Sequence, residues 1–445
     1  MELNKEVMQA VESLDYRVTV GDVATKAGLN VEVAQQGLLA LASETQGHMQ
    51  VSETGEIAYE FPRNFRGVLR NKYWQLRAQE TLSKVWSALF YVIRISFGIM
   101  LMVSIAIISI AIIVLVIAAS SQGGGNSRDN RRGGGGFVFF PTNFFYLFDF
   151  NYGRGRYGRG RGRYPNRGTS RYGGSYSGGR GRSSPSGEKL PFLEAIFSFL
   201  FGDGDPNEDL EERRWQAIGS VITNNGGAIA AEQVTPYLDD LGEGSDREYE
   251  DYMLPVLTRF NGQPEVSPTG DMVYYFPELQ VSAMQRGKAA VSAYLKETKR
   301  KFTSATSDQV MISIALGALN LVGALVLWNL LQTATVDIEF IAFVESIYWL
   351  LAGYGTAFLG LPLIRYYWML RQNAKIEKRN EERAIRATTL NRLGAAFQQK
   401  LAFAKQFAAQ KVLNERDAVY STETDLAEQG GDPDEADFLR RLNEI

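Results

Sequence analysis

An arginine-, glycine- and tyrosine-rich run holds the side chains whose types and spacing are most suggestive of chemistry. Residues 151–184 contain nine arginines, five tyrosines and no acidic residue. Guanidinium groups bind phosphate, and tyrosine rings stack on bases. A run of this composition cannot bury enough apolar surface to fold, so we expect it to be disordered. Its candidate contact residues, for anionic lipid or for RNA, are Arg154, Arg156, Tyr157, Arg159, Arg161, Arg163 and Tyr164.

A second set of residues has the spacing of a cation loop. Carboxylates and an amide alternate at Asp203, Asp205, Asn207 and Asp209. An EF-hand calcium loop also needs glycine at its sixth position and glutamate at its twelfth. This chain has Glu208 and Arg214 there. We therefore predict no metal at this turn, whose acids instead favour the N-terminus of a following helix.

Catalytic chemistry has few side chains to draw on. The chain contains no cysteine and one histidine, His48, which we expect in a loop before a strand. Thiolate nucleophiles and disulfides are therefore excluded, and zinc, haem and iron–sulfur sites are disfavoured because they draw on cysteine and histidine. We predict no catalytic residue, no cofactor and no enzymatic activity.

The most informative element is a segment that occurs twice. Residues 51–62 read Val-Ser-Glu-Thr-Gly-Glu-Ile-Ala-Tyr-Glu-Phe-Pro, and residues 266–277 read Val-Ser-Pro-Thr-Gly-Asp-Met-Val-Tyr-Tyr-Phe-Pro. Basic residues and then an apolar stretch follow each copy. The chain is therefore a duplicated unit of a small domain and a membrane anchor. We expect the residues Thr54, Gly55, Tyr59, Phe61, Thr269, Gly270, Tyr274 and Phe276 of the repeat to be mostly structural.

Each copy reads as a winged-helix-like domain. In the first, helices over 4–14, about 20–27 and 31–43 precede two strands joined by a turn at Gly55. Apolar spacing around Gly28 predicts a helix-turn-helix. In the second, we predict helices over 210–222, 231–241 and 246–260, followed by strands over 265–267 and 272–276.

Charge argues against DNA as the partner of these domains. Residues 1–62 hold three basic and ten acidic side chains, and residues 210–279 hold four and thirteen. Binding to a duplex needs lysine and arginine to neutralise phosphates. The charges of −7 and −9 would instead repel it. We expect protein–protein contact, with homo-oligomer formation left open.

Three apolar stretches are long enough to cross a bilayer, at residues 95–119, 310–331 and 340–364. Lysine and arginine flank the outer ends of all three, whereas the loop between the second and third has only Asp337 and Glu339. The positive-inside rule then places the N-terminus, the second domain and the C-terminus in the cytoplasm. One span between two cytoplasmic domains leaves an odd number of crossings. The short apolar stretches 137–148 and 190–201 are candidates for a re-entrant or interfacial segment. Alternatively, the run from Val85 to Ser120 enters and leaves the membrane on one side, or the second domain is translocated.

The expected fold class is mostly α with small β-hairpins: two winged-helix-like domains, transmembrane helices and a long C-terminal helix. The expected boundaries are 1–62 (first domain), 63–94 (basic linker helix), 95–119 (transmembrane helix), 120–189 (disordered segment), 190–209 (apolar stretch and acidic turn), 210–279 (second domain), 280–309 (basic linker helix), 310–331 and 340–364 (transmembrane helices), and 365–445 (amphipathic helix and acidic tail). Within the last, Lys375 to Val412 reads as one helical stretch with an apolar stripe at Phe397, Leu401 and Ala404.

Three motifs carry a resemblance to a known family. They are the segment 211–215 (Glu-Glu-Arg-Arg-Trp), the segment 227–237, and the repeated Val-Ser-x-Thr-Gly. The chain resembles uncharacterised membrane proteins of cyanobacteria that have relatives in chloroplasts. The resemblance implies a thylakoid or plasma membrane and brings no activity with it. The resulting hypothesis is a non-enzymatic membrane scaffold or assembly protein. The alternative is a membrane-tethered RNA binder acting through the arginine-rich run.

Overall fold

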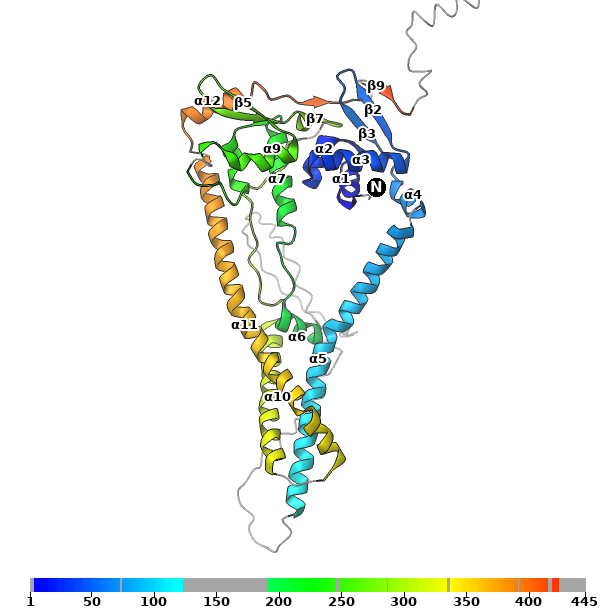
Figure 1. Cartoon of the computed structure of the whole chain (residues 1–445), viewed down its shortest axis with the longest axis vertical. Coiled ribbons are helices and arrows are strands. Elements are labelled where there is room, and N and C mark those ends of the chain that lie inside the picture. Colours follow the sequence, from blue (N-terminus) through cyan, green and yellow to red (C-terminus); the bar gives the residue numbers. More distant parts are fainter. Residues whose placement is uncertain are drawn as a thin grey trace, which may run out of the picture. The chain divides into compact units, whose positions relative to one another are not determined.

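The protein forms two compact units. The computed structural model describes residues 4–72, 74–122, 191–244, 248–285, 287–333, 337–390, 392–414 and 418–423. The module unit comprises residues 1–87, 204–300 and 368–445, and the span unit comprises residues 88–203 and 301–367. The described residues are mostly helical, with small sheets and several long apolar helices (Figure 1). The expected fold class is confirmed at this level.

The first module has the elements expected for residues 1–62 and one strand more. They are α1 (Lys5–Ser13), β1 (Arg17–Thr19), α2 (Val20–Ala27), α3 (Val31–Thr45), β2 (His48–Ser52) and β3 (Ile57–Glu60). Thr19 and Asp22 form a capping box at the start of α2, and Gly28 ends α2 with a φ of 66°. Asn30 caps α3. The additional strand β1 pairs with β3. His48, expected in a loop, is the first residue of β2.

The second module departs further from the expected helices. It contains α7 (Leu210–Asn224), β4 (Ala228–Ile229), α9 (Leu254–Phe260), β5 (Gln263–Val266) and β6 (Met272–Tyr275). The helix predicted over 231–241 is wrong: short 3-10 turns η2 (Ala231–Gln233) and η3 (Thr235–Tyr237) stand there. The one predicted over 246–260 is shorter, because η4 (Asp251–Met253) precedes α9. Pro236 disfavours continuous helix in the first of these segments, and Glu250, with a left-handed φ of 57°, interrupts the second.

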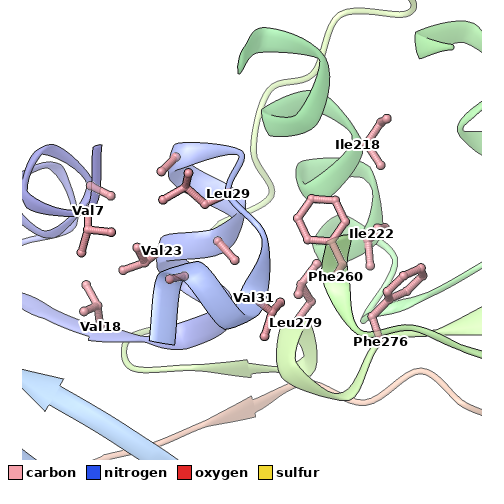
Figure 2. Close-up of a cluster of buried hydrophobic side chains, with 14 of the residues drawn as sticks. Val7, Val18, Val23, Leu29, Val31, Ile218, Ile222, Phe260, Phe276 and Leu279 are labelled. Carbon is pink, nitrogen blue, oxygen red and sulfur yellow. The ribbon is translucent and has the colours of Figure 1, made fainter. Parts of the chain in front are cut away.

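The two modules share one hydrophobic core. Val23 and Leu29 of the first module belong to the same buried cluster as Ile218 and Phe260 of the second (Figure 2). Helix α2 lies against α7, and a Cβ added at Gly21 would lie 2.0 Å from the carbonyl oxygen of Glu278. The two modules therefore fold against each other and not as independent domains.

The basic linker helix expected over 280–309 is wrong. The element η5 (Pro277–Gln280) leads into β7 (Val281–Ser282), and none of the described residues from 283 to 306 is helical. Side-chain amides satisfy this extended backbone instead: Asn380 accepts from the Glu297 amide at 2.9 Å, and Asn207 from the Thr298 amide at 2.7 Å. These long-range partners outweigh local helix propensity.

The C-terminal region is also divided differently. Helix α11 (Glu339–Leu390) continues from the third apolar stretch without a break, and α12 (Ala395–Ala404), β8 (Lys411–Val412) and β9 (Ala418–Ser421) follow. The single helix expected over 375–412 is therefore wrong. Gly394 at the N-cap of α12 separates the two helices, as a residue of low helix propensity can.

Three helices of the structure are long and apolar enough to cross a membrane. They contain the candidate spans Val85–Ser120, within α5 (Trp74–Gln122), Ser307–Thr333, which is α10, and Glu339–Leu390, which is α11. The shorter α6 (Phe192–Phe201) is apolar as well. Helix α4 (Phe65–Lys72) and the start of α5 occupy the first linker. No membrane is part of the structure, so the assignment rests on length and composition.

Contacts within the span unit separate its two ends. At one end Leu101, Phe199, Leu316 and Phe358 form a buried cluster, which brings α6 beside the first half of the α5 span. At the other end the cluster joins Leu115, Leu327 and Val344. Arg365 donates to the Phe199 carbonyl at 2.8 Å and so caps the C-terminus of α6. The chain has thus returned, by the start of α6, to the end at which α5 entered.

Candidate protein-docking site at the repeated turn

The arginine-rich candidate residues lie outside the part of the chain that the structure describes. They are Arg154, Arg156, Tyr157, Arg159, Arg161, Arg163 and Tyr164. The short stretch 137–148 lies outside it too. Contact of this run with lipid or RNA stays a prediction.

The alternating acids of residues 203–209 have protein partners. Asp203 accepts from the Ser304 amide at 2.7 Å and from Ser198 Oγ at 2.8 Å. Asp205 pairs with Arg300, and Asp209 with Arg213 at 3.0 Å. Among the described residues no group of three or more histidines and carboxylates could hold a metal ion.

The repeated turn of the first module forms a small polar cage. Ser52 ends β2, and Thr54 and Glu56 lie on the loop that leads to β3, where Gly55 adopts a φ of 87°. Ser52 Oγ and Thr54 Oγ1 are 3.1 Å apart, and both hydroxyls donate to Glu56 Oε2. The Ser52 amide also donates to the Glu56 carbonyl at 3.0 Å, which closes the turn. A carboxylate held in this way is a ready acceptor for a cation.

This cage holds the chain's own C-terminal segment. Lys411 Nζ lies 3.0 and 2.9 Å from the two carboxylate oxygens of Glu56 and also donates to Thr54. A few residues later, β9 adds to the outer edge of β2 as an antiparallel strand, with Val51 opposite Tyr420. Burial would raise the pKa of Glu56, but the hydrogen bonds from Ser52, Thr54 and Lys411 outweigh it and lower that pKa to about 2. The turn therefore binds a peptide segment through one ammonium group and one strand edge.

The second module builds the same turn. Ser267 Oγ and Thr269 Oγ1 are 2.7 Å apart, Thr269 donates to Asp271 Oδ2 at 2.8 Å, and Gly270 has a φ of 86°. The Ser267 amide donates to the Asp271 carbonyl at 2.8 Å, as at Ser52. No lysine or arginine of the described residues pairs with Asp271.

Further along each repeat, the aromatic residues are core residues. Tyr59 and Phe61 of the first module and Tyr274 and Phe276 of the second are buried. Ring pairs such as Tyr59–Phe61, with centroids 6.5 Å apart, tie the turns to the module cores. These positions have the structural role expected from the sequence.

A buried lysine attaches α12 to the second module. Lys400 Nζ lies 2.9 Å from Glu232 Oε1 and 2.7 Å from Glu250 Oε1, and Tyr274 donates to Glu250 at 2.9 Å. Burial lowers the pKa of Lys400, but the two carboxylates outweigh it and raise the pKa above its ordinary value. The sequence analysis missed this group. The sequence does contain a signal for it: Lys400 follows Phe397 by three residues and precedes Ala404 by four. This spacing puts the lysine on the apolar face of the helix, where a cation needs a buried partner.

Arginines on one face of α11 bind the second module and the extended linker that follows it. Arg379 forms a bidentate pair with Glu297 at 2.7 and 2.5 Å, and Arg383, which is 1% exposed, contacts both Glu297 and Asp239. One turn later Arg386 donates to the Leu238 carbonyl at 2.7 Å. Burial would raise the pKa of Glu297, but its arginine partners lower it. Bidentate guanidinium pairs of this kind fix orientation as well as distance.

A polar cavity of about 430 Å³ lies between the modules. Its lining includes Asp22 and Lys26 from α2, Ser220 and Thr223 from α7, and Lys288 from the extended linker. Asp22 already accepts from the Ala283 amide at 2.9 Å and from Ser282 Oγ at 2.9 Å, so this carboxylate joins the linker to the first module. The cavity is therefore lined partly by groups that hold the modules together.

The fold and the turns define a class of protein: three apolar helices long enough to span a membrane, attached to a pair of fused acidic modules. Over 459 aligned residues the chain is 37% identical to an uncharacterised chloroplast protein of Arabidopsis thaliana, covering 100% of this chain and 83% of the relative. The chain belongs to the same family as that protein. No family model matches the chain, and no solved structure gives a significant match. The expected kinship with uncharacterised chloroplast proteins is thus confirmed.

Proposed function

We propose that this protein is a non-enzymatic membrane scaffold whose acidic modules hold protein segments at one membrane surface. The observation that carries the proposal is the occupied turn of the first module: its polar side chains and its strand edge contact a peptide segment, Lys411 with β9. Strand addition of this kind gives affinity through the main chain and specificity through side chains. The repeat would then be a peptide-holding device used twice.

A membrane location is part of the proposal. Three apolar helices and a chloroplast relative are compatible with a thylakoid membrane protein, and a plasma membrane is the other candidate. The flanking lysines and arginines favour a cytoplasmic position for the N-terminus, the second module and the C-terminus. The packing of α6 beside the first half of the α5 span supports a common side for all three.

The modules are interpreted as winged-helix-like, and DNA is not their proposed ligand. In the first module the element order α1-β1-α2-α3-β2-β3, with the sheet order β1-β3-β2, suits this interpretation. Arg17, one of its three basic residues, points its guanidinium at the Ala283 and Leu413 carbonyls at 2.6 and 2.7 Å. A module of net negative charge with an arginine committed to such bonds is poorly suited to a phosphate backbone.

The test separates the scaffold from the alternative of an RNA binder. Photo-crosslinking groups placed at the exposed Glu32 and Asp240 are activated in intact membranes, and ultraviolet crosslinking of RNA is run in parallel. The scaffold predicts stoichiometric protein adducts at the modules, anionic lipid or nothing at the arginine-rich run, and retention in membranes after carbonate washing. RNA adducts mapping to residues 154–164, with no protein adduct at the modules, would favour the RNA binder instead.

A further inference from the structure

The two hairpins have the same strand register, so their residues correspond one to one. Tyr59 lies opposite Met49 in the first, and Tyr274 lies opposite Pro264 in the second. Val51 is opposite Ile57, and Val266 is opposite Met272. Since the turns close with the same bond, Ser52 corresponds to Ser267, and the strand edges can be compared position by position.

In the first module the outer edge of β2 is occupied. The Ser52 amide donates to the turn of its own hairpin, and because backbone groups alternate along an antiparallel strand, those of Met49 and Val51 face outward. The amide of Thr422 donates to the Met49 carbonyl at 3.0 Å, and Tyr420 lies opposite Val51. The sheet order is β1-β3-β2-β9, so β9 completes this edge.

In the second module the corresponding edge is open among the described residues. Its sheet ends at β5, in the order β4-β6-β5, and Val266 is 60% exposed. By the same alternation the backbone groups of Pro264 and Val266 face outward. Pro264 has no backbone amide to donate. In the first module the corresponding amide, that of Met49, donates only to the side-chain hydroxyl of Thr422 and to no backbone group of β9. The Pro264 carbonyl and both backbone groups of Val266 therefore match groups that face β9 in the first module.

The carboxylate at the end of this edge also has no cation partner among the described residues. The cage of Ser267, Thr269 and Asp271 repeats the one that receives Lys411, and no cation of the described chain fills it. The module around it carries thirteen acidic and four basic side chains. A positively charged ligand is therefore favoured over a neutral or acidic one.

We infer that the edge of β5 binds an extended peptide segment of a partner protein, which adds as an antiparallel strand and places a lysine ammonium in the Ser267–Thr269–Asp271 cage. The lysine precedes the strand by about the separation of Lys411 from β9. This inference rests on the proposed function and names the chemistry of its partner. The second module thus offers to another chain the site that the first module fills with its own.

The probe is a synthetic peptide with the sequence of residues 410–423, added to the full chain in lipid nanodiscs. Amide hydrogen exchange reports on each edge separately. We expect slower exchange at Val266, because its amide gains a strand partner, and unchanged exchange over β2, which β9 already covers. Asp271→Asn weakens binding about tenfold, since a charge-assisted hydrogen bond is lost. Val266→Pro removes the outward amide, and we expect it to abolish binding of a fluorescently labelled form of the peptide, measured by titration.

The matched control is Asp240→Asn, the same change at another exposed acid of the second module, which leaves binding unchanged. Replacing the lysine of the peptide by glutamine should lower its affinity by the same factor as Asp271→Asn. Combining the changed peptide with the Asp271→Asn protein should lower the affinity no further, because both changes remove the same interaction in a double-mutant cycle. The inference is overturned if Val266 exchange does not change, if Asp271→Asn and Asp240→Asn act alike, or if the peptide protects only residues 48–52. Those outcomes concern the peptide edge alone, because crosslinking at the modules tests the scaffold independently.

Discussion

Single buried cations connect elements far apart in sequence. Lys400 and Arg383 have side-chain exposures of 7% and 1%; Lys400 contacts two carboxylates of the second module, and Arg383 contacts Asp239 of that module and Glu297 of the extended linker. A buried charge is costly unless it is paired and hydrogen-bonded, so these contacts admit one arrangement and penalise others. Their main effect is to fix where α12 and α11 lie on the second module.

Replacing Lys400 by methionine leaves Glu232 and Glu250 without their cation. The free energy of opening of α12 should fall by about 3–5 kcal/mol, because removal of one partner leaves a buried charge uncompensated. Native-state hydrogen exchange of α12 amides measures it. Lys405→Met, at an exposed lysine just after the same helix, should change it by less than about 0.5 kcal/mol. Equal effects of the two substitutions would contradict the assignment.

The Glu56 carboxyl should titrate with a pKa of about 2, compared with its ordinary 4.5. Because the folded-state pKa is lowered, its contribution to holding the C-terminal segment is complete above about pH 4.5 and is lost as the pH falls toward 2. Carbon-detected NMR of the carboxyl group measures this titration. Lys411→Met should raise the pKa part of the way to 4.5, since Ser52 and Thr54 still donate. A Glu56 carboxyl that titrates with a pKa of 4.5 in the intact chain would contradict its contact with Lys411.

At the scale of elements, close approach of backbones joins the two modules. Helix α2 contacts η5 at Gly21, where no side chain fits. Arg259 of α9 donates to the Gly28 carbonyl at 2.8 Å and lies 4.5 Å from the centroid of the Trp215 ring. Neither contact depends on a periodic pattern, so both are decided by the packing of α2 against the second module.

Gly21→Ala should therefore destabilise the shared core by about 1–3 kcal/mol, as overpacking does, because its Cβ would lie 2.0 Å from the Glu278 carbonyl oxygen. Hydrogen exchange of α2 and α7 amides reports the change. Gly67→Ala is the counterpart in α4, where a Cβ would meet nothing within 4 Å. That variant should be neutral or gain up to about 1 kcal/mol in helix stability. A neutral Gly21→Ala would show that the modules separate readily.

For the whole molecule, the proposed topology rests on which elements gather at each end of the span unit. Residues 97–105, α6, the start of α10 and Phe358 gather at one end, whereas Leu115, Leu327 and Val344 gather at the other. The four points at which the chain passes between the units therefore belong to one end. This favours a protein whose modules and tail share one surface.

The natural absence of cysteine makes this directly testable. Single cysteines at Glu32, Asp240 and Asp337, all exposed, are treated with a membrane-impermeant maleimide in sealed vesicles of known orientation. Glu32→Cys and Asp240→Cys should react from the same side, and Asp337→Cys only from the opposite one. Reaction of the first two from different sides would place the modules on opposite faces and refute the proposed topology.

Much of the architecture follows from local pattern. Apolar runs long enough for a bilayer predict the three long helices, because a helix in lipid must satisfy its own backbone bonds. The repeated Ser-x-Thr-Gly turn predicts both hairpins, because Gly55 and Gly270 supply the positive φ that the turn requires. In the linker, by contrast, helix propensity predicted structure where Asn207 and Asn380 hold an extended chain.

The sequence by itself determined the repeated segment, the acidic charge of the modules and the apolar helices, since each is a property of neighbouring residues or of composition. Only the tertiary structure decided that the modules share a core, that Lys411 meets Glu56 across 355 residues, and that β9 covers one hairpin while the other ends at β5. The reason is physical: such contacts depend on which surfaces the folded chain brings together, and a pairing of single side chains leaves no periodic trace in the sequence.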